Sequence, residues 1–235
     1  KGVGDAQARA VADARTEGGA FRSLSDFARR IDHRQVNKKA LECLANAGAF
    51  DELEPERATA FASIEPMLAT AQRRAEERAF GQVALFGDAQ EAPIKVKATP
   101  WNLGDRLQRE FDAIGFFLSG HPLEAHEAAI KRLGAIRWTE FVSRARGGQP
   151  VWTLAASVID RMERRTKAGK KMGIIQMSDP SGQYEAIIFE EGLAKYRDML
   201  EKGADVLVRL EGRVEGEDVR HDFLDSLVGK VCKCE

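Results

Sequence analysis

A change in hydrophobic periodicity at Gly147-Gly148-Gln149-Pro150 restricts the folds that this chain can adopt. Before this segment, apolar residues recur every three or four positions, which is the pattern of one helix face. After it, they fall into short runs rich in Val, Ile and Leu, which are typical of strands. The sequence therefore predicts an α+β chain with several domains, in which an all-α part precedes a β part.

Gly, Pro and capping residues set the expected bounds of the helices. Ser23 or Ser25 is a suitable N-cap, and Gly48 stands where a C-cap glycine belongs. The predicted helices cover residues 5–15, a segment opening at Ser23 or Ser25, and residues 38–47, 56–80, 101–118 and 123–133.

The order of elements after Pro150 indicates the type of β domain. Strands are predicted over residues 151–159, 172–178, 184–189 and 205–214, with a helix over residues 190–201. Three strands, a helix and then more β structure is the order of an OB-fold, a small Greek-key barrel. The expected domains are a helical module at 1–80, a linker at 81–100, a helical connector at 101–148, the barrel at 149–220 and a tail at 221–235.

Composition excludes several classes of protein. The chain of 235 residues has 36 Lys and Arg against 37 Asp and Glu, so it is not a globally basic nucleic-acid coat, although local basic patches remain possible. No apolar run approaches the roughly 20 residues that a membrane span needs, so we expect a cytoplasmic protein without a membrane partner. Three cysteines without metal-ligand spacing to the histidines indicate reduced thiols and no zinc site.

No catalytic constellation stands out in the sequence. Carboxylates are scattered among Lys and Arg, there is no Walker-type phosphate loop, and no Ser or Cys lies in a nucleophile context. We therefore expect a binding protein with no catalytic residues, no metal and no cofactor of its own. A nuclease with a metal site is a rival interpretation, and the lack of clustered carboxylates argues against it.

Two basic regions are candidates for nucleic-acid binding. Gly2-Val3-Gly4 precedes a predicted helix, where glycines allow a phosphate to approach backbone N–H groups. Arg34, Lys38 and Lys39 add positive charge to the same module. A plain turn beside a solvated surface explains these residues equally well.

The connector between the first two predicted strands is more strongly basic, with a single acidic residue, Glu163. In an OB-fold this loop forms a wall of the nucleic-acid groove. Candidate stacking residues are Trp152, Tyr184 and Phe189, and the alternative is an exposed flexible hairpin. The candidate cations of the connector are Arg161, Arg164, Arg165, Lys167, Lys170 and Lys171.

A short motif in the predicted linker suits recognition by another protein. Gln82 can anchor an extended peptide by hydrogen bonds, while Leu85 and Phe86 fill an apolar pocket. Motifs this short also occur by chance. The glycines on both sides and the position in a predicted linker nevertheless support this interpretation.

The motifs, taken in order, resemble the C-terminal region of the bacterial DNA polymerase III alpha subunit family. The most specific is the segment from Glu110 to Leu123, which resembles a family signature of the form E-x-x-x-x-G-x-x-L-S-G-H-P-L. The resemblance covers residues 1 to about 220. It also rests on Lys1-Gly2-Val3-Gly4, Phe21-Arg22-Ser23-Leu24-Ser25-Asp26-Phe27, Val36-Asn37-Lys38-Lys39-Ala40-Leu41 and Ala47-Gly48-Ala49-Phe50-Asp51.

This resemblance implies a role for each region. Residues 1–50 would be helix-hairpin-helix elements that hold duplex DNA by its backbone, with Gly2 and Gly4 in the first hairpin. Gln82, Leu85 and Phe86 would dock the polymerase on the sliding clamp, the beta subunit. Residues 151–220 would be an OB domain near single-stranded template, working with other polymerase III holoenzyme subunits.

The same resemblance implies that the catalytic residues of the polymerase lie outside this chain. The family is a DNA-directed DNA polymerase, a nucleotidyltransferase of DNA replication, whose palm aspartates lie upstream of the matching region. We therefore expect this chain to be inactive alone, and Mg²⁺ only at that absent palm site.

The sequence after Arg220 departs from the family, because the expected apolar run is missing. This predicts a short fifth strand and an open barrel edge. The alternative function is a stand-alone module that binds single-stranded nucleic acid through its OB-fold without clamp contact.

Overall fold

The computed structural model describes residues 2–79, 94–215, 218–223 and 229–230. The chain divides into two compact units, Lys1–Leu118 and Ser119–Glu235. Among the described residues, no helix has both the length and the apolar character of a membrane span.

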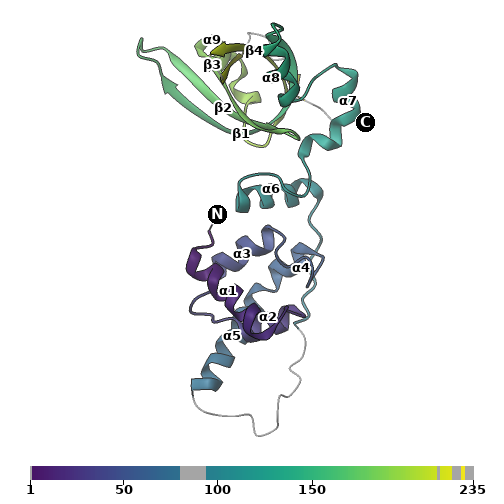
Figure 1. Ribbon diagram of the computed structural model, residues 1–235, viewed down its shortest axis with the longest axis vertical. Helices are drawn as coiled ribbons and strands as arrows, with labels where there is room; N and C mark the ends of the chain where they lie inside the picture. Colours follow the sequence, from purple (N-terminus) through teal and green to yellow (C-terminus); the bar gives the residue numbers. More distant parts are fainter. Residues whose placement is uncertain (1, 80–93, 216–217, 224–228, 231–235) are drawn as a thin grey trace. The chain divides into compact units, whose positions relative to one another are not determined.

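In its described residues, the first unit consists of α-helices and loops built around one apolar core. Helix α2 packs against α5, and α3 contacts α4, α5 and α6. Buried residues from these helices and their loops include Phe27, Val36, Leu41, Phe50 and Met67. The helices are α1 (Asp5–Gly18), α2 (Leu24–Arg30), α3 (Lys38–Asn46), α4 (Arg57–Ala62), α5 (Ile64–Ala79) and α6 (Leu103–Ile114) (Figure 1).

The helix ends follow the capping residues of the sequence. The Ser23 hydroxyl accepts a hydrogen bond from the Asp26 N–H at the start of α2, and the Asn37 side chain accepts one from the Ala40 N–H at α3. Gly48 has φ +81° just after α3, a backbone conformation that glycine adopts without strain. The predicted N-cap at Ser23 and the glycine stop at Gly48 are confirmed.

Two predicted helices of this unit were too long. The helix expected over 56–80 is interrupted at Ser63, so it forms α4 and α5. The helix expected to reach Leu118 ends at Ile114, because Gly115 adopts a left-handed conformation with φ 102°. Apolar spacing continued past Gly115 in the sequence, but a left-handed residue cannot continue a right-handed helix.

The end of the predicted linker, from Ile94 onward, and the start of the predicted connector are held on the helical unit. The Ile94 N–H donates to the Ser25 hydroxyl at 2.9 Å, and Ile94 packs against the apolar core. Trp101 makes an edge contact with Phe61 at 5.7 Å between ring centroids, and the Arg109 guanidinium lies 4.3 Å from the Trp101 centroid.

The second unit begins with short helices and continues as a β-barrel. The helix predicted over 123–133 begins as the 3₁₀ helix η1 (Pro122–His126) and ends as α7 (Glu127–Arg132), while α8 (Trp138–Arg146) had no counterpart in the prediction. The helix predicted over 190–201 is α9 (Glu190–Tyr196) followed by the 3₁₀ helix η2 (Arg197–Met199). The strands are β1 (Val151–Arg165), β2 (Lys171–Asp179), β3 (Gly182–Phe189), β4 (Asp205–Glu215), β5 (Asp218–Phe223) and β6 (Gly229–Lys230).

The first five strands close into a ring. β1, β2 and β3 form an antiparallel meander, and β3 pairs in parallel with β5 at Ile187 and Asp222. β5 pairs antiparallel with β4, and β4 pairs antiparallel with β1 from Val151–Glu211 to Ser157–Asp205. This ring, with α9 between β3 and β4, is the five-stranded Greek-key barrel of an OB-fold.

The predicted open barrel edge is wrong. β5 continues through Phe223, whose side chain is buried, and it pairs with strands on both sides. A short β6 also pairs with β4 at Val206 and Leu207. The sequence lacks the apolar run expected for this strand, yet one aromatic residue is enough to face the core because strand pairing itself supplies the backbone hydrogen bonds.

The barrel interior is filled by aliphatic residues and covered by α8. Leu154, Ile175, Ile188 and Leu210 are fully or almost fully buried, and Phe141 of α8 joins the same core. Figure 1 shows α8 and α9 lying against the barrel, in agreement with their contacts to its strands.

Candidate nucleic-acid interface

The β1–β2 hairpin is the most basic feature of the barrel unit. After Ser157, β1 leaves β4 and pairs only with β2, as far as the pair Arg165 and Lys171. The turn is closed by a hydrogen bond from the Thr166 N–H to the Lys170 carbonyl at 2.8 Å. In Figure 1 this hairpin projects from the barrel.

A register shift between Val158 and Asp160 decides which side chains face outward. Beyond the shift, residues of three paired strands form rungs on the surface opposite the core, because side chains alternate along each strand. We call these nine residues the outer face. Its rungs are Asp160–Gln176–Glu185, Met162–Ile174–Ile187 and Arg164–Met172–Phe189.

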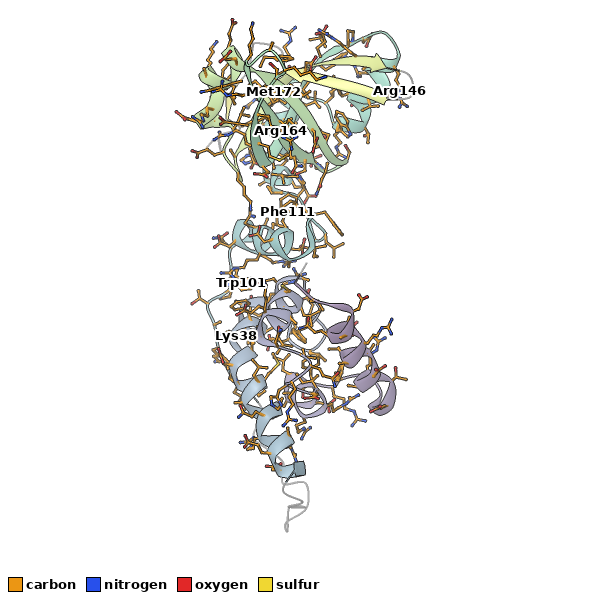
Figure 2. The ribbon with its side chains drawn as sticks, turned by 90° about the vertical axis from the view of Figure 1, so that its left-hand side faces the viewer. Lys38, Trp101, Phe111, Arg146, Arg164 and Met172 are labelled. Atoms are coloured by element: carbon orange, nitrogen blue, oxygen red, sulfur yellow. The ribbon has the colours of Figure 1, made fainter. Side chains whose placement is uncertain are left out.

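The rungs differ in chemistry. The first carries two carboxylates, and the Gln176 amide donates to the Glu185 carboxylate at 2.8 Å. The second is entirely apolar and half-buried. The third combines a cation, a thioether and a ring, and Figure 2 shows Arg164 and Met172 close together, as their pairing requires.

The predicted cations of this connector do not share one environment. Arg164, Lys167, Lys170 and Lys171 are exposed. Lys170 is the last residue of the turn before β2, next to the Arg164 end of the outer face, while Lys171 begins β2 and pairs with Arg165 on the opposite face. Lys167 lies in the turn.

Two arginines of the predicted set have partners within the hairpin or the barrel. The exposed Arg165 donates from Nη1 to the Gly169 carbonyl at 3.1 Å. Arg161 pairs with Ile175 on the core-facing side of the hairpin. Its guanidinium donates to the carbonyl oxygens of Arg197 and Leu200, the latter at 3.3 Å, and lies 3.5 Å from the Glu163 carboxylate. Arg161 therefore fastens β1 to the segment after α9.

The three predicted stacking residues differ in exposure and in their neighbours. The Trp152 ring is covered by the Arg144 guanidinium at 4.0 Å. Tyr184 is buried and stacks on Trp138, with 4.3 Å between ring centroids and 7° between planes. Phe189 is 54% exposed at the end of β3.

In the helical unit, the structure brings the Gly2-Val3-Gly4 segment against α3. Gly2 has φ +82°, and a Cβ at this position would lie 2.6 Å from the Cys43 sulfur and 3.8 Å from Lys39 Cε. Only glycine fits both the backbone conformation and the space. Gly4 is the N-cap of α1, and its N–H donates to the Gln7 amide oxygen at 2.9 Å.

The other predicted residues of this unit are all exposed but differ in their partners. Lys39 lies beside Gly2, so a predicted cation is adjacent to the predicted phosphate-binding glycine segment. Lys38 forms an ion pair with Glu65, which raises the pKa of Lys38 through their hydrogen bond. The Arg34 backbone N–H donates to Asp32 Oδ1 at 2.9 Å within the turn before α3.

The predicted clamp-docking residues Gln82, Leu85 and Phe86 lie outside the described residues. Over the described part of the chain, no group of three or more His, Cys, Asp or Glu side chains is arranged to hold a metal ion.

Comparison with known proteins identifies a matching family model and several relatives of this chain. A helix-hairpin-helix motif model matches residues 1–60. The DNA polymerase III subunit alpha of Caulobacter vibrioides is 39% identical over 208 residues, and the proteins of the same name from Vibrio cholerae and Escherichia coli K12 are each 34% identical, over 223 and 224 residues. These alignments cover 88%, 93% and 93% of this chain. The chain belongs to the DNA polymerase III alpha subunit family.

The chain spans about a fifth of the length of these alpha subunits, since the alignments cover 18%, 19% and 19% of them. Solved structures that are similar to part of this chain include the SSB domain of a Synechococcus sp. protein, with a TM-score of 0.28, 12% identity and coverage of 32% of this chain and 86% of that one. The mitochondrial single-stranded DNA binding protein Rim1 of S. cerevisiae matches with a TM-score of 0.30, 15% identity and coverage of 34% and 95%. The barrel assignment itself rests on the strand order.

Two residues of the alpha-subunit signature, Glu110 and His121, are buried and hydrogen-bonded, which gives them structural roles. Glu110 is fully buried, accepts from Arg57 Nη1 at 2.8 Å, and accepts from the Leu118 N–H at 2.6 Å. His121 is buried in the second unit, where its Nδ1 accepts from the Leu123 N–H at 3.2 Å and its Nε2 lies 3.0 Å from the Ser178 hydroxyl. Burial lowers the pKa of His121 to about 4, so the ring is neutral.

The sequence analysis missed the apolar residues of the outer face in this alpha-subunit relative. Met172, Ile174 and Ile187 looked like ordinary strand residues, because a two-residue period does not say which face is covered. Met162 lay in the predicted connector, which in the structure belongs to β1. Their common orientation emerges only when the three strands are paired in register.

Proposed function

We propose that this chain is a DNA-binding part of a replicative polymerase alpha subunit, in which the β1–β2 hairpin holds single-stranded DNA. The observation that carries this proposal is the group of exposed cations Arg164, Lys167, Lys170 and Lys171 on a hairpin of a closed OB barrel. Between Arg161 and Lys171 the single carboxylate, that of Glu163, lies 2.9 Å from the Arg197 guanidinium and is thus partly neutralised. Such a surface attracts a phosphate backbone and releases its counterions on binding.

The helical unit is proposed to hold duplex DNA. Gly2 and Gly4 shape a hairpin at the start of the fourteen-residue helix α1, and the exposed Lys39 lies beside it. Backbone N–H groups and one lysine suit a phosphate and carry no information about base sequence. Arg34 and Lys38 extend the positive charge along the start of α3.

Clamp docking is proposed for Gln82, Leu85 and Phe86 on the basis of the motif and the family. Both flanks of residues 80–93 belong to the helical unit: α5 ends at Ala79, and Ile94 is hydrogen-bonded to Ser25. A docked motif would raise the local concentration of the DNA-binding surfaces at the primer, which favours processive synthesis.

The wider role is proposed by analogy with the relatives. We propose that polymerisation and its Mg²⁺ ions belong to parts of the alpha subunit outside the matched fifth, and that the protein works in the cytoplasm with the other holoenzyme subunits.

The proposal is tested by fluorescence anisotropy with a labelled oligodeoxythymidine and with a labelled duplex. Replacing Arg164, Lys167, Lys170 and Lys171 by Ala should abolish single-strand binding at physiological salt and leave duplex binding in place. A control with the same loss of charge replaces exposed residues of the other unit, Arg9, Arg15, Lys95 and Lys97, by Ala. Equal single-strand affinity of the parent and the hairpin variant would refute the proposal.

A further inference from the structure

We propose that Phe189 and Met172 form a stacking platform for one base of a single strand that crosses the β1–β2 hairpin at the Arg164 rung. This inference rests on the proposed function and assigns the base-contacting residues within that surface. The sequence analysis named Phe189 as a candidate stacking residue but did not name Met172.

The first argument is the exposure of Phe189. Its ring is 54% exposed although it ends a strand whose other aromatic residue, Tyr184, is buried. The Cα partner of Phe189 is Met172, which is half-buried and lies on the same face. A flexible thioether beside an exposed ring forms a flat and adaptable apolar surface.

The second argument is that the apolar surface is continuous. Met162, Ile174 and Ile187 form the next rung and are each half-buried, so the platform borders three further apolar side chains. A nucleobase that stacks on Phe189 could cover part of this rung as well. Contiguous exposed apolar patches on a protein surface commonly mark binding sites.

The third argument is the order of charges across the outer face. Arg164 and Lys170 lie on the side of the hairpin tip, whereas Asp160 and Glu185 lie one rung beyond the apolar residues. A phosphate backbone is therefore attracted to the tip side and repelled from the other side, which points its bases toward the apolar rung.

The charges also limit the platform to one base. Glu190 and Glu191 follow Phe189 directly at the start of α9 and are exposed. Their carboxylates disfavour a backbone that continues past Phe189 over the helix. The strand thus crosses the sheet, and the stacked base lies between the cations and the acidic helix start.

The test compares Phe189→Ala with a matched change, Phe116→Ala, at a ring that is 49% exposed in the other unit. Affinity for oligodeoxythymidine is measured by anisotropy over a series of salt concentrations, using the whole 235-residue chain. Phe189→Ala should weaken binding about tenfold without changing the salt slope. Arg164→Ala should reduce the slope of log affinity against log salt by about 0.7.

A second probe shows whether Phe189 acts through a base. With an oligonucleotide of the same length and charge whose central sugars lack bases, the parent and Phe189→Ala should bind equally, and Phe189→Trp should restore binding to the intact oligonucleotide. An equal loss on both oligonucleotides would overturn the platform, as would an altered oligomeric state with unchanged DNA affinity. If Phe189→Ala has no effect while the quadruple hairpin variant loses binding, the platform fails and the proposed function stands. If even the parent does not bind, both fail.

Discussion

Arg57 and Glu110 form a buried ion pair between residues 53 positions apart in the sequence. The Arg57 Nη1 atom donates to Glu110 Oε2 at 2.8 Å, and the two side chains are 7% and 0% exposed. The same guanidinium also donates from Nη2 to the Asp51 carboxylate oxygen Oδ2 at 2.8 Å. The pair fastens α6 to the helical unit, because Glu110 is an α6 residue and Arg57 begins α4.

Removing one partner of this pair should strongly destabilise the helical unit. Glu110→Gln removes the buried carboxylate of the pair and leaves Arg57 with Asp51, whose side chain is 42% exposed, so the expected loss is about 1.5–3 kcal/mol in the free energy of unfolding. Urea unfolding followed by helical circular dichroism measures it. The control is Glu65→Ala, which breaks the exposed pair with Lys38 and should have a much smaller effect. Equal losses in the two variants would contradict the role of burial.

His121 should make the barrel unit sensitive to acid. Its pKa is about 4 in the folded protein because burial disfavours the charged ring, against an ordinary value of 6.5. The unfolded chain therefore binds more protons between these values, so stability is complete above pH 6.5 and falls as the pH drops toward 4. The total loss is about 3 kcal/mol.

This acid sensitivity can be assigned to His121 by comparison with His121→Gln. Urea unfolding at several pH values should show a shallower dependence between pH 6.5 and 4 in the variant than in the parent. An NMR titration of the His121 ring should show no protonation until the pH approaches 4. Protonation near pH 6.5 in the folded protein would refute the assignment.

The sequence predicted the fold class because local signals agreed with the final structure. Ser23 and Gly48 bound their helices as expected, and the order of strands around α9 indicated the barrel correctly. Helix ends were predicted less well where apolar spacing continued beyond a stop, as at Gly115. The closure by β5 could not be predicted, since it depends on pairing with strands β3 and β4 that are distant in sequence.

The candidate site was only partly predictable for the same reason. A run of basic residues indicates a charged hairpin, but the register decides that Arg164 faces outward and Arg161 inward. Similarly, three aromatic residues were equivalent in the sequence until Trp138 and Arg144 covered two of them. Tertiary neighbours separate a structural residue from a binding residue.

Arg161 and Arg164 should therefore respond differently to replacement by Ala. Arg161→Ala removes hydrogen bonds from a charged donor to the carbonyls after α9 and should cost about 2 kcal/mol of stability. Arg164→Ala should leave the melting temperature unchanged and weaken single-strand binding. Thermal unfolding and anisotropy are measured on both variants. A stable Arg161→Ala variant, or an Arg164→Ala variant that binds single strands like the parent, would contradict the prediction.

Tyr184→Phe should not destabilise the barrel. The Tyr184 hydroxyl is buried and has no hydrogen-bond partner among the described residues, so its removal should be neutral or stabilise the fold by up to about 1 kcal/mol. Ser157→Ala is the contrasting change, because the Ser157 hydroxyl donates to the largely buried Asp205 carboxylate at 2.5 Å. That variant should lose about 1–3 kcal/mol. A larger loss in Tyr184→Phe than in Ser157→Ala, by chemical denaturation, would show that the hydroxyl has a partner.

The clamp-docking proposal predicts that the chain binds the sliding clamp through three side chains. Calorimetric titration with the clamp of the same organism should give an affinity on the order of micromolar, about −8 kcal/mol, as befits a short peptide motif. Gln82→Ala with Phe86→Ala should abolish the heat of binding, because one change removes the anchoring amide and the other removes a ring from its pocket. Val83→Ala, at a spacer position of the same motif, should bind like the parent. Binding by the double variant at parental affinity would place clamp contact elsewhere, and no binding by the folded parent would leave the barrel hairpin as the principal interaction surface.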